Sequence, residues 1–254
     1  MSSVDAASSA QPGSPAQPGS PISSAQPATA YSPGEADPPA IRFGVVGAGF
    51  IARWFLQAVR TVPRARVVAV TSARPESAAA FAAEHGIGAS YATLEEMLAA
   101  GRPGGASPFD VVYIGSPNSL HASQTIAALE AGFHVLVEKP FALDAEQAEA
   151  MVAAAAHHDR FLMEGWLTAF EPGTAALRRA LPALLNDGPG PHRAVLVKEQ
   201  YSSRMDRLRA GELPPAFDPE LGGGSLMDLG VYPVSLAVHL FGAPSRITAT
   251  GRTL

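Results

Sequence analysis

From residue 41 onward, short runs of β-branched apolar residues alternate with alanine-rich stretches whose apolar positions recur at helical spacing. Such alternation is typical of a parallel sheet that helices cover on both faces. We predict strands at residues 41–46, 66–71, 110–115 and 134–138. We predict helices at residues 51–60, 75–85, 93–99, 119–131 and from Asp144 to about residue 157. The pattern therefore predicts an α/β fold whose first domain, residues 40–160, is a doubly wound Rossmann sheet.

Two of these helices carry a recognisable start. Thr93 and Asp144 can each cap a helix with a side-chain oxygen, and Glu96 and Gln147 follow three residues later. This spacing is that of a capping box, in which each of the two side chains binds a backbone amide group of the first helical turn. We therefore expect both helices to begin directly after the capping residue.

The pattern changes after residue 160. It predicts a strand at 194–201, a loop rich in proline and glycine at 211–224, an apolar helix at 226–241 and a final strand from Arg246. We therefore predict a second, α+β domain over residues 161–254. With so few strands, its open sheet would be thin and would have exposed edges. We expect this sheet to be incomplete, either because the chain is cut short or because the sheet is completed elsewhere.

The first 39 residues have a different composition, rich in alanine, serine, proline and glycine. Such a segment buries too little apolar surface to offset the entropy of an ordered chain, so we expect a disordered low-complexity tail. It has neither the charged start nor the apolar stretch of a secretory signal or a membrane anchor. We therefore expect a cytoplasmic protein.

The composition excludes several classes of protein. A chain of 254 residues with 47% hydrophobic residues can supply a sizeable core. The formal net charge of -5 offers no electrostatic basis for binding nucleic acid or an anionic membrane. The sequence has no cysteine, which excludes disulfides, thiolate metal sites and a cysteine nucleophile. The histidines and acidic residues are scattered without ligand spacing, so we expect no metal site.

A glycine-rich turn follows the first predicted strand. Residues 47–52 read G-A-G-F-I-A, which fits the pattern G-x-G-x-x-A. Gly47 permits the tight turn and Gly49 lets a pyrophosphate approach the backbone, while Phe50 and Ile51 open the helix whose free amide groups face the phosphates. The motif alone is weak, because glycine also ends strands for structural reasons. The strand before it and the helix after it favour dinucleotide binding.

The choice of coenzyme depends on the end of the second strand. NAD-binding versions carry an acidic residue there, which binds the ribose 2′-hydroxyl group. This chain has Ser72 and Arg74 instead, which can hold a 2′-phosphate by a hydroxyl hydrogen bond and a guanidinium pair. We therefore predict NADP as the preferred coenzyme, with NAD as the alternative if Arg74 is only a solvated loop residue.

Lys139 is the first catalytic candidate. The chain has two lysines, Lys139 and Lys198, and its other basic side chains, histidines apart, are arginines. Arginine cannot release a proton near neutral pH, whereas a desolvated lysine can do so beside a substrate hydroxyl group. Lys139 follows a predicted parallel strand, where ligands gather in open α/β sheets. The alternative is a lysine that merely caps the strand end.

Asp228 and Tyr232 stand four residues apart on the predicted apolar helix, so their side chains share one face. Tyrosine is a poor base at neutral pH, but a neighbouring ammonium group favours its phenolate form. We therefore predict Tyr232 as the proton-transfer residue, tuned by Lys139, while Asp228 orients the substrate hydroxyl group. The alternative for Tyr232 is a core aromatic residue.

Four ordered motifs carry a family resemblance: GVVGAGFIA, SPNSLH, VEKP and GGGSLMDLGVY. From residue 41 to its end, the chain resembles the glucose-fructose oxidoreductase and inositol dehydrogenase-like family, nearest to the branch of the dihydrodiol and sugar dehydrogenases. The resemblance implies an NAD(P)-dependent oxidoreductase acting on CH–OH groups of a small polyol or sugar. It also implies further sheet sequence after Leu254 and a homo-oligomer formed through that sheet.

The resemblance assigns roles to individual residues as well. It implies that Lys139 contacts the reacting oxygen, that Glu138 lies near the cofactor, and that Pro140 often follows a cis peptide bond. The further cofactor-side residues that it implies are Ser116, Pro117, Asn118 and His121. Of these, Pro117 and Asn118 are expected against the nicotinamide ribose, and His121 is better explained as a helix-start residue than as a catalyst.

Two other functions stay open at this point. Some relatives of this fold bind a dinucleotide as regulators without turning over a substrate, and some distant relatives are glycosidases that hold NAD tightly. Lys139 together with Asp228 and Tyr232 argues against a regulator. The loop around Arg74 argues against an NAD-dependent glycosidase.

Overall fold

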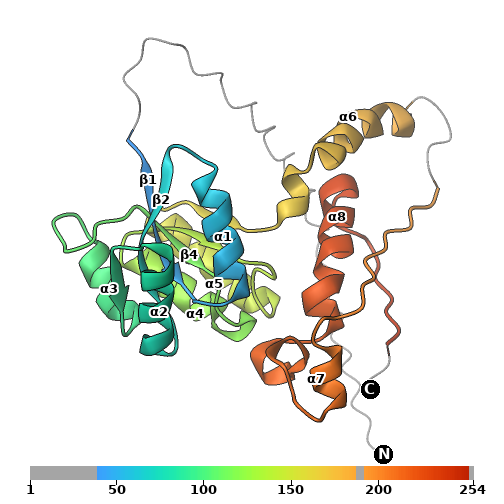
Figure 1. Cartoon of the computed structure of the whole chain (residues 1–254). Helices are drawn as coiled ribbons and strands as arrows, with labels where there is room; N and C mark the ends of the chain where they lie inside the picture. The colour runs from blue at the N-terminus through green and yellow to red at the C-terminus, as the bar shows by residue number, and fades with distance from the viewer. Residues whose placement is uncertain (1–38, 187–191, 252–254) are drawn as a thin grey trace, which may run out of the picture. The chain divides into compact units, whose positions relative to one another are not determined.

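The computed structural model describes residues 39–186 and 192–251. Figure 1 traces the order of the elements along the chain. The tail predicted at residues 1–39 lies outside the described residues, except for Pro39. The domain that follows begins directly with the first strand.

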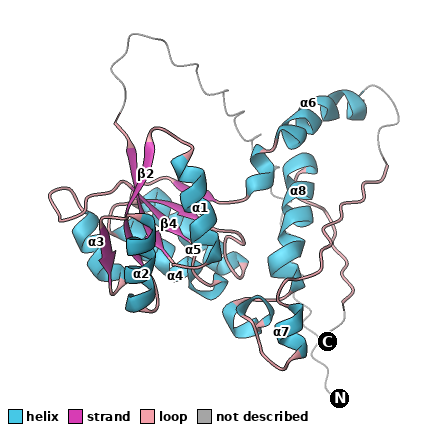
Figure 2. Ribbon diagram, in the orientation of Figure 1, coloured by secondary structure: helices cyan, strands magenta, loops and turns pink. Residues whose placement is uncertain are grey.

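A parallel sheet of six strands forms the centre of the fold, in the order β3-β2-β1-β4-β5-β6 (Figure 2). The strands are β1 (Ile41–Val46), β2 (Ala65–Thr71), β3 (Ala89–Tyr91), β4 (Val111–Ile114), β5 (His134–Val137) and β6 (Leu162–Glu164). The four predicted strands are confirmed, with ends that differ by one residue at most. β3 and β6 were not predicted, because three residues are too few to display a periodic pattern. Since β6 pairs with β5, the sheet extends past residue 160, where the first domain was predicted to end.

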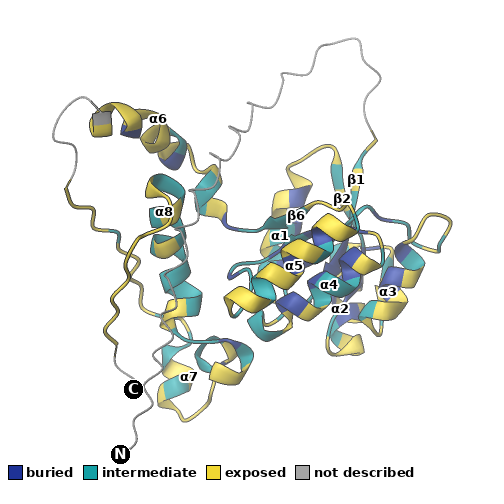
Figure 3. Cartoon of the chain, turned by 180° about the vertical axis from the view of Figure 1, so that it is seen from behind, coloured by how far each residue is buried: buried dark blue, intermediate teal, exposed yellow. Residues whose placement is uncertain are grey.

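Helices cover both faces of this sheet, as predicted. The helices are α1 (Phe50–Arg60), α2 (Pro75–His85), α3 (Leu94–Gly101), α4 (His121–Glu130) and α5 (Ala145–His157). On one face, α1 and α2 pack on an apolar cluster that includes Leu56, Val70 and Phe81. On the other, α3, α4 and α5 enclose a second cluster around Leu129 and Met151. Figure 3 shows the buried residues gathered on α4, α5 and the sheet, which confirms a doubly wound α/β core.

The two predicted capping boxes are present. The Thr93 hydroxyl oxygen accepts a hydrogen bond from the Glu96 amide group at 3.2 Å, and the Asp144 carboxylate accepts one from the Gln147 amide group at 2.8 Å. In return, the side chains of Glu96 and Gln147 bind the backbone amide of the residue before each cap. The starts of α3 and α5 are therefore fixed by local sequence alone.

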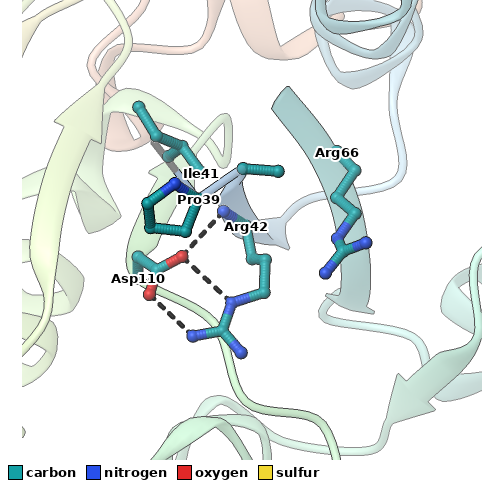
Figure 4. A pocket seen from close by; sticks show the side chains of 6 residues that line it. Pro39, Ile41, Arg42, Arg66 and Asp110 are labelled. Atoms are coloured by element: carbon teal, nitrogen blue, oxygen red, sulfur yellow. Dashed lines mark hydrogen bonds and ion pairs between the residues drawn. The ribbon is translucent and has the colours of Figure 1, made fainter. Parts of the chain in front are cut away.

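An ion pair joins the amino end of β1 to the start of β4. Asp110 accepts hydrogen bonds from the Arg42 guanidinium at 2.8 and 3.1 Å, and from the Arg42 amide group at 2.8 Å. Figure 4 shows this pair beside Arg66 in an open hollow. The hollow lies at the amino ends of the strands, whereas ligands of such sheets bind at the carboxyl ends. We therefore interpret it as a feature of the fold.

We expect Asp110→Asn to lower the free energy of unfolding by about 1 kcal/mol at neutral pH, since the pair is bidentate but partly exposed. The Arg42 guanidinium lowers the pKa of Asp110 below its usual range. A lowered folded-state pKa gives stability that is present above the unfolded-state pKa of about 4 and is lost as the pH falls below it. Urea unfolding at pH 7 and pH 3 measures this. Arg66→Met, in the same hollow, is the control and should change neither value.

Beyond β6 the described residues form helices and turns. The helices are α6 (Pro172–Asn186), α7 (Met205–Arg209) and α8 (Val231–Phe241), and α8 is preceded by a π-helical turn, Leu226–Gly230. The predicted helix at 226–241 is thus confirmed. The predicted strands at 194–201 and from Arg246 are wrong, because the described residues of both segments pair with no neighbouring strand. Their apolar side chains, such as Val195 and Ile247, stay exposed, and no strand is found beyond β6 among residues 165–186 and 192–251.

One stretch, Pro219–Phe241, is long and apolar enough to cross a membrane by length and composition. Its regular α-helical part is only the 11 residues of α8, which span about 16 Å, against about 30 Å of hydrocarbon. Glycines interrupt the segment before the π-helical turn, and Asp228 within that turn forms an ion pair. These features favour a helix of the folded protein.

Candidate active site

The site begins where β1 ends, between β2 and β4. The helices that follow these two strands, α2 and α4, lie on opposite faces of the sheet. Gly47 has a φ of +109°, and a Cβ atom there would lie 2.6 Å from the Gly115 carbonyl oxygen, at the end of β4. Its amide group donates a hydrogen bond to the Thr71 carbonyl, at the end of β2, at 2.8 Å. The turn therefore requires glycine at this position.

Gly49 has a different role, because a Cβ atom there would meet nothing within 4 Å. It stands at the N-cap of α1, and no side chain caps this helix. This helix start thus has no side-chain cap, and the space beside Gly49 is open, which is what a pyrophosphate requires. Phe50 is exposed, whereas Ile51 packs toward Gly115. The residues present therefore fit a dinucleotide.

The loop after β2 has no carboxylate at the position that usually binds the ribose. Buried Thr71 donates its hydroxyl hydrogen bond to the Tyr91 carbonyl at 3.0 Å. The Ser72 hydroxyl donates to the Arg74 carbonyl at 2.8 Å, so Ser72 shapes the loop. The Arg74 side chain is exposed at the N-cap of α2. A positive charge therefore stands beside the expected ribose position.

Lys139, Asp228 and Tyr232 come together although 89 residues separate the lysine from the aspartate. The Lys139 ammonium group donates to the Asp228 side chain at 3.0 Å and to the Asp228 carbonyl at 3.2 Å. It also lies 5.1 Å from the centroid of the Tyr232 ring. Only 17% of the Lys139 side chain is exposed, so this ammonium group is largely removed from water. The peptide bond between Lys139 and Pro140 is cis.

Two half-buried carboxyl groups lie behind Lys139. Glu138 accepts a hydrogen bond from the Tyr113 hydroxyl at 2.7 Å and another from the Lys139 amide at 3.2 Å. Glu164 accepts one from the Phe141 amide at 2.9 Å. Burial raises the pKa of both carboxyl groups. Both carboxyl groups hold the backbone next to Lys139. For Glu138, this contact was not predicted from the sequence.

His121, which was predicted on the cofactor side, is fully buried. Its ring nitrogens lie 2.9 Å from the Pro140 carbonyl oxygen and 3.1 Å from the Ser116 carbonyl oxygen. Burial lowers the pKa of His121, which favours the neutral ring. The imidazole thus joins the loop after β4 to the loop of Lys139.

The loop after β4 also binds the glycine-rich segment at residues 222–224. The Ser116 hydroxyl donates to the Gln124 side chain at 2.6 Å, and the Asn118 side-chain amide donates to the Gly222 carbonyl at 2.8 Å. Gly222 has a φ of +72°, and a Cβ atom there would lie 2.3 Å from Leu143. This glycine is therefore required for a close approach of the chain, and is more than a flexible link.

Lys198 is the residue that the sequence analysis left without a role. Its ammonium group lies 5.2 Å from the centroid of the Tyr232 ring, almost the distance found for Lys139. Both lysines of the chain therefore meet at one phenol. The rarity of lysine in this sequence is a signal that could have found Lys198 as well.

Comparison with known proteins relates these features to a family. Residues 41–166 match the model of an oxidoreductase family with an NAD-binding Rossmann fold, and residues 199–254 match that of the GFO/IDH/MocA C-terminal domain. The scyllo-inositol 2-dehydrogenase (NADP(+)) IolU of Bacillus subtilis is 40% identical over 84% of this chain. The trans-1,2-dihydrobenzene-1,2-diol dehydrogenase of Sus scrofa is 34% identical over the same share. The chain spans 62% and 60% of the lengths of these two relatives.

A solved structure agrees with the sequence comparison. The WlbA dehydrogenase from Bordetella pertussis, in complex with NADH and UDP-GlcNAcA, superposes with a TM-score of 0.66 at 25% identity. The match covers 82% of this chain and 57% of that one. The similarity therefore extends through both the sheet and the helical segment that follows it.

Proposed function

This chain belongs to the GFO/IDH/MocA family of oxidoreductases, and from that premise we propose that it is an NAD(P)-dependent dehydrogenase or reductase. Its substrate is a secondary alcohol or hemiacetal of a sugar, an inositol or a cyclic diol. The observation that carries this proposal is the meeting of Lys139, Asp228 and Tyr232 at the carboxyl end of β5. The named activities of the relatives, an inositol dehydrogenase and dihydrodiol dehydrogenases, support the same class.

In this proposal, the backbone amides around Gly49 hold the pyrophosphate, and the loop Ser116–Pro117–Asn118 contacts the nicotinamide ribose. The nicotinamide, when bound, takes or gives the hydride. The protein aligns the substrate and handles the proton of its hydroxyl group. Glu138 and His121 act from behind, by fixing the two loops that carry the contacting groups.

The ammonium group of Lys139 favours the phenolate form of Tyr232, and this phenolate accepts the substrate proton and becomes a neutral phenol. Asp228 uses one carboxylate oxygen to hold Lys139 and offers the other to the substrate hydroxyl group. The Lys139 side chain keeps its position because the Asp228 carboxylate and carbonyl both bind it. The three residues thus form one proton-handling unit.

The direct test of this function is absorbance at the reduced-nicotinamide band. Purified protein is mixed with NADP or NAD and with a panel of aldoses, inositols and cyclic diols. Turnover of at least one CH–OH substrate with a change in this band is the expected result. A protein that binds the dinucleotide but turns over no member of the panel in either direction would instead be a binding regulator, and the proposal would fail.

We predict that Arg74→Ala lowers the preference for NADP over NAD by about tenfold or more. The guanidinium group is the cation that stands beside the expected 2′-phosphate, and a charge-assisted hydrogen bond is worth about 1.5–3 kcal/mol. Calorimetry with both coenzymes measures the ratio. Arg60→Ala, an exposed arginine at the far end of α1, is the control. An unchanged ratio in the Arg74 variant would show that Arg74 is only a solvated loop residue.

The remaining expectations stay predictions. They are the cytoplasmic location, the absence of nucleic-acid and membrane partners, and the homo-oligomer formed through further sheet sequence. The comparisons lend no support to the two alternative functions, the non-catalytic regulator and the NAD-dependent glycosidase.

A further inference from the structure

Lys198 lies at the proposed active site without being part of its proton-handling unit. It belongs to the extended segment before α7, and its ammonium group lies 5.2 Å from the centroid of the Tyr232 ring. Lys139 approaches the same ring to 5.1 Å. Because the chain has no further lysine, both of its ammonium groups are found at this one side chain.

The two lysines differ in their partners. Lys139 is paired with the Asp228 carboxylate at 3.0 Å. For Lys198, no carboxylate of residues 39–186 or 192–251 lies within 4.0 Å, and its contact is the face of the Tyr232 ring. Lys198 is therefore an ammonium group at this site that no carboxylate of the described part of the chain pairs with.

An uncompensated ammonium group next to a ligand site attracts an anionic group of the ligand. Lys198 carries a single positive charge, which a carboxylate balances. A phosphate monoester, with nearly two negative charges, would leave an excess of negative charge beside Asp228. The contact with the ring is weak in water and leaves the ammonium hydrogens free to bind. The charge balance thus favours a carboxylate over a phosphate.

We propose that Lys198 is a specificity-determining residue that binds a carboxylate on the substrate, so that the preferred substrate is a sugar acid. This inference rests on the proposed function for the location of the substrate. Lys139, Asp228 and Tyr232 then act on the hydroxyl group, while Lys198 recognises the acid at another position of the same molecule. The neutral polyols would bind without this contact.

The test compares glucuronate with glucose, which differ by a carboxylate in place of a hydroxymethyl group. Calorimetry measures the affinity of both for the protein saturated with its nicotinamide coenzyme. We expect wild-type protein to bind glucuronate about tenfold more tightly than glucose. Lys198→Met should remove this difference and leave the glucose affinity unchanged. Lys198→Arg should retain most of it, and added salt should reduce it.

Arg193→Met removes a positive charge from the same segment and is the matched control, expected to behave like wild type. Equal affinities of wild-type protein for the two sugars, or no binding of glucuronate, would overturn the proposal. So would a Lys198→Met variant that loses affinity for both sugars equally or for the coenzyme. Binding of glucuronate through Lys198, with no turnover of glucuronate or of any substrate of the panel above, would refute the oxidoreductase function and leave the role of Lys198 intact.

Discussion

Lys139→Met is expected to lower kcat/KM by about 10²–10⁴-fold while the affinity for the nicotinamide coenzyme stays unchanged, since general acid–base groups contribute rate factors of this size. The variant removes the ammonium group that lies between the Asp228 carboxylate and the Tyr232 ring. Methionine fills a similar volume, so the fold should survive. Steady-state absorbance measurements give the rate, and calorimetry gives the coenzyme affinity.

Lys139→Arg separates two explanations of that loss. Arginine keeps the positive charge and the pair with Asp228, but it cannot release a proton near neutral pH. If Lys139 takes part in proton transfer, the arginine variant should be nearly as slow as Lys139→Met. Recovery of most of the activity by arginine would show that only charge is needed. Equal turnover by wild type and Lys139→Met would end the assignment of this lysine to the reaction.

Gly47→Ala is expected to destabilise the protein by about 2–4 kcal/mol, the largest effect on folding that we predict. The residue has a φ of +109°, and the new methyl group would lie 2.6 Å from the Gly115 carbonyl oxygen. Strain in an unfavourable φ/ψ region costs about 1–3 kcal/mol, and a clash between two backbone segments cannot be relieved by a change of rotamer. Urea unfolding followed by circular dichroism measures the loss.

Gly49→Ala is the matched variant two residues away, where the added methyl group meets nothing within 4 Å and φ is -90°. Its stability should equal or slightly exceed that of the wild type. Its coenzyme affinity should fall by about tenfold or more, because the methyl group takes the space through which the pyrophosphate reaches the backbone. If both variants lost the same stability, our distinction between the fold glycine and the ligand glycine would be wrong.

Local interactions explain the parts of the fold that the sequence determined. The helix starts at Thr93 and Asp144 depend on side chains three residues apart, and the turn at Gly47 depends on the conformational freedom of one residue. The long strands and helices show their periodicity within a few residues. For the same reason, the G-x-G-x-x-A motif and the position of Lys139 after a strand could be read in advance.

Tertiary structure decided what depends on distant partners. The segment 194–201 has the pattern of a strand but lacks a neighbour to supply hydrogen bonds, whereas β6 is only three residues long and forms because β5 lies beside it. The burial of His121 and the approach of Lys198 to Tyr232 likewise join residues far apart in the chain. The periodicity of a sequence shows which side of a helix or strand is apolar. Which strands pair, and which charged side chains meet, depends on the residues that the folded chain places next to them.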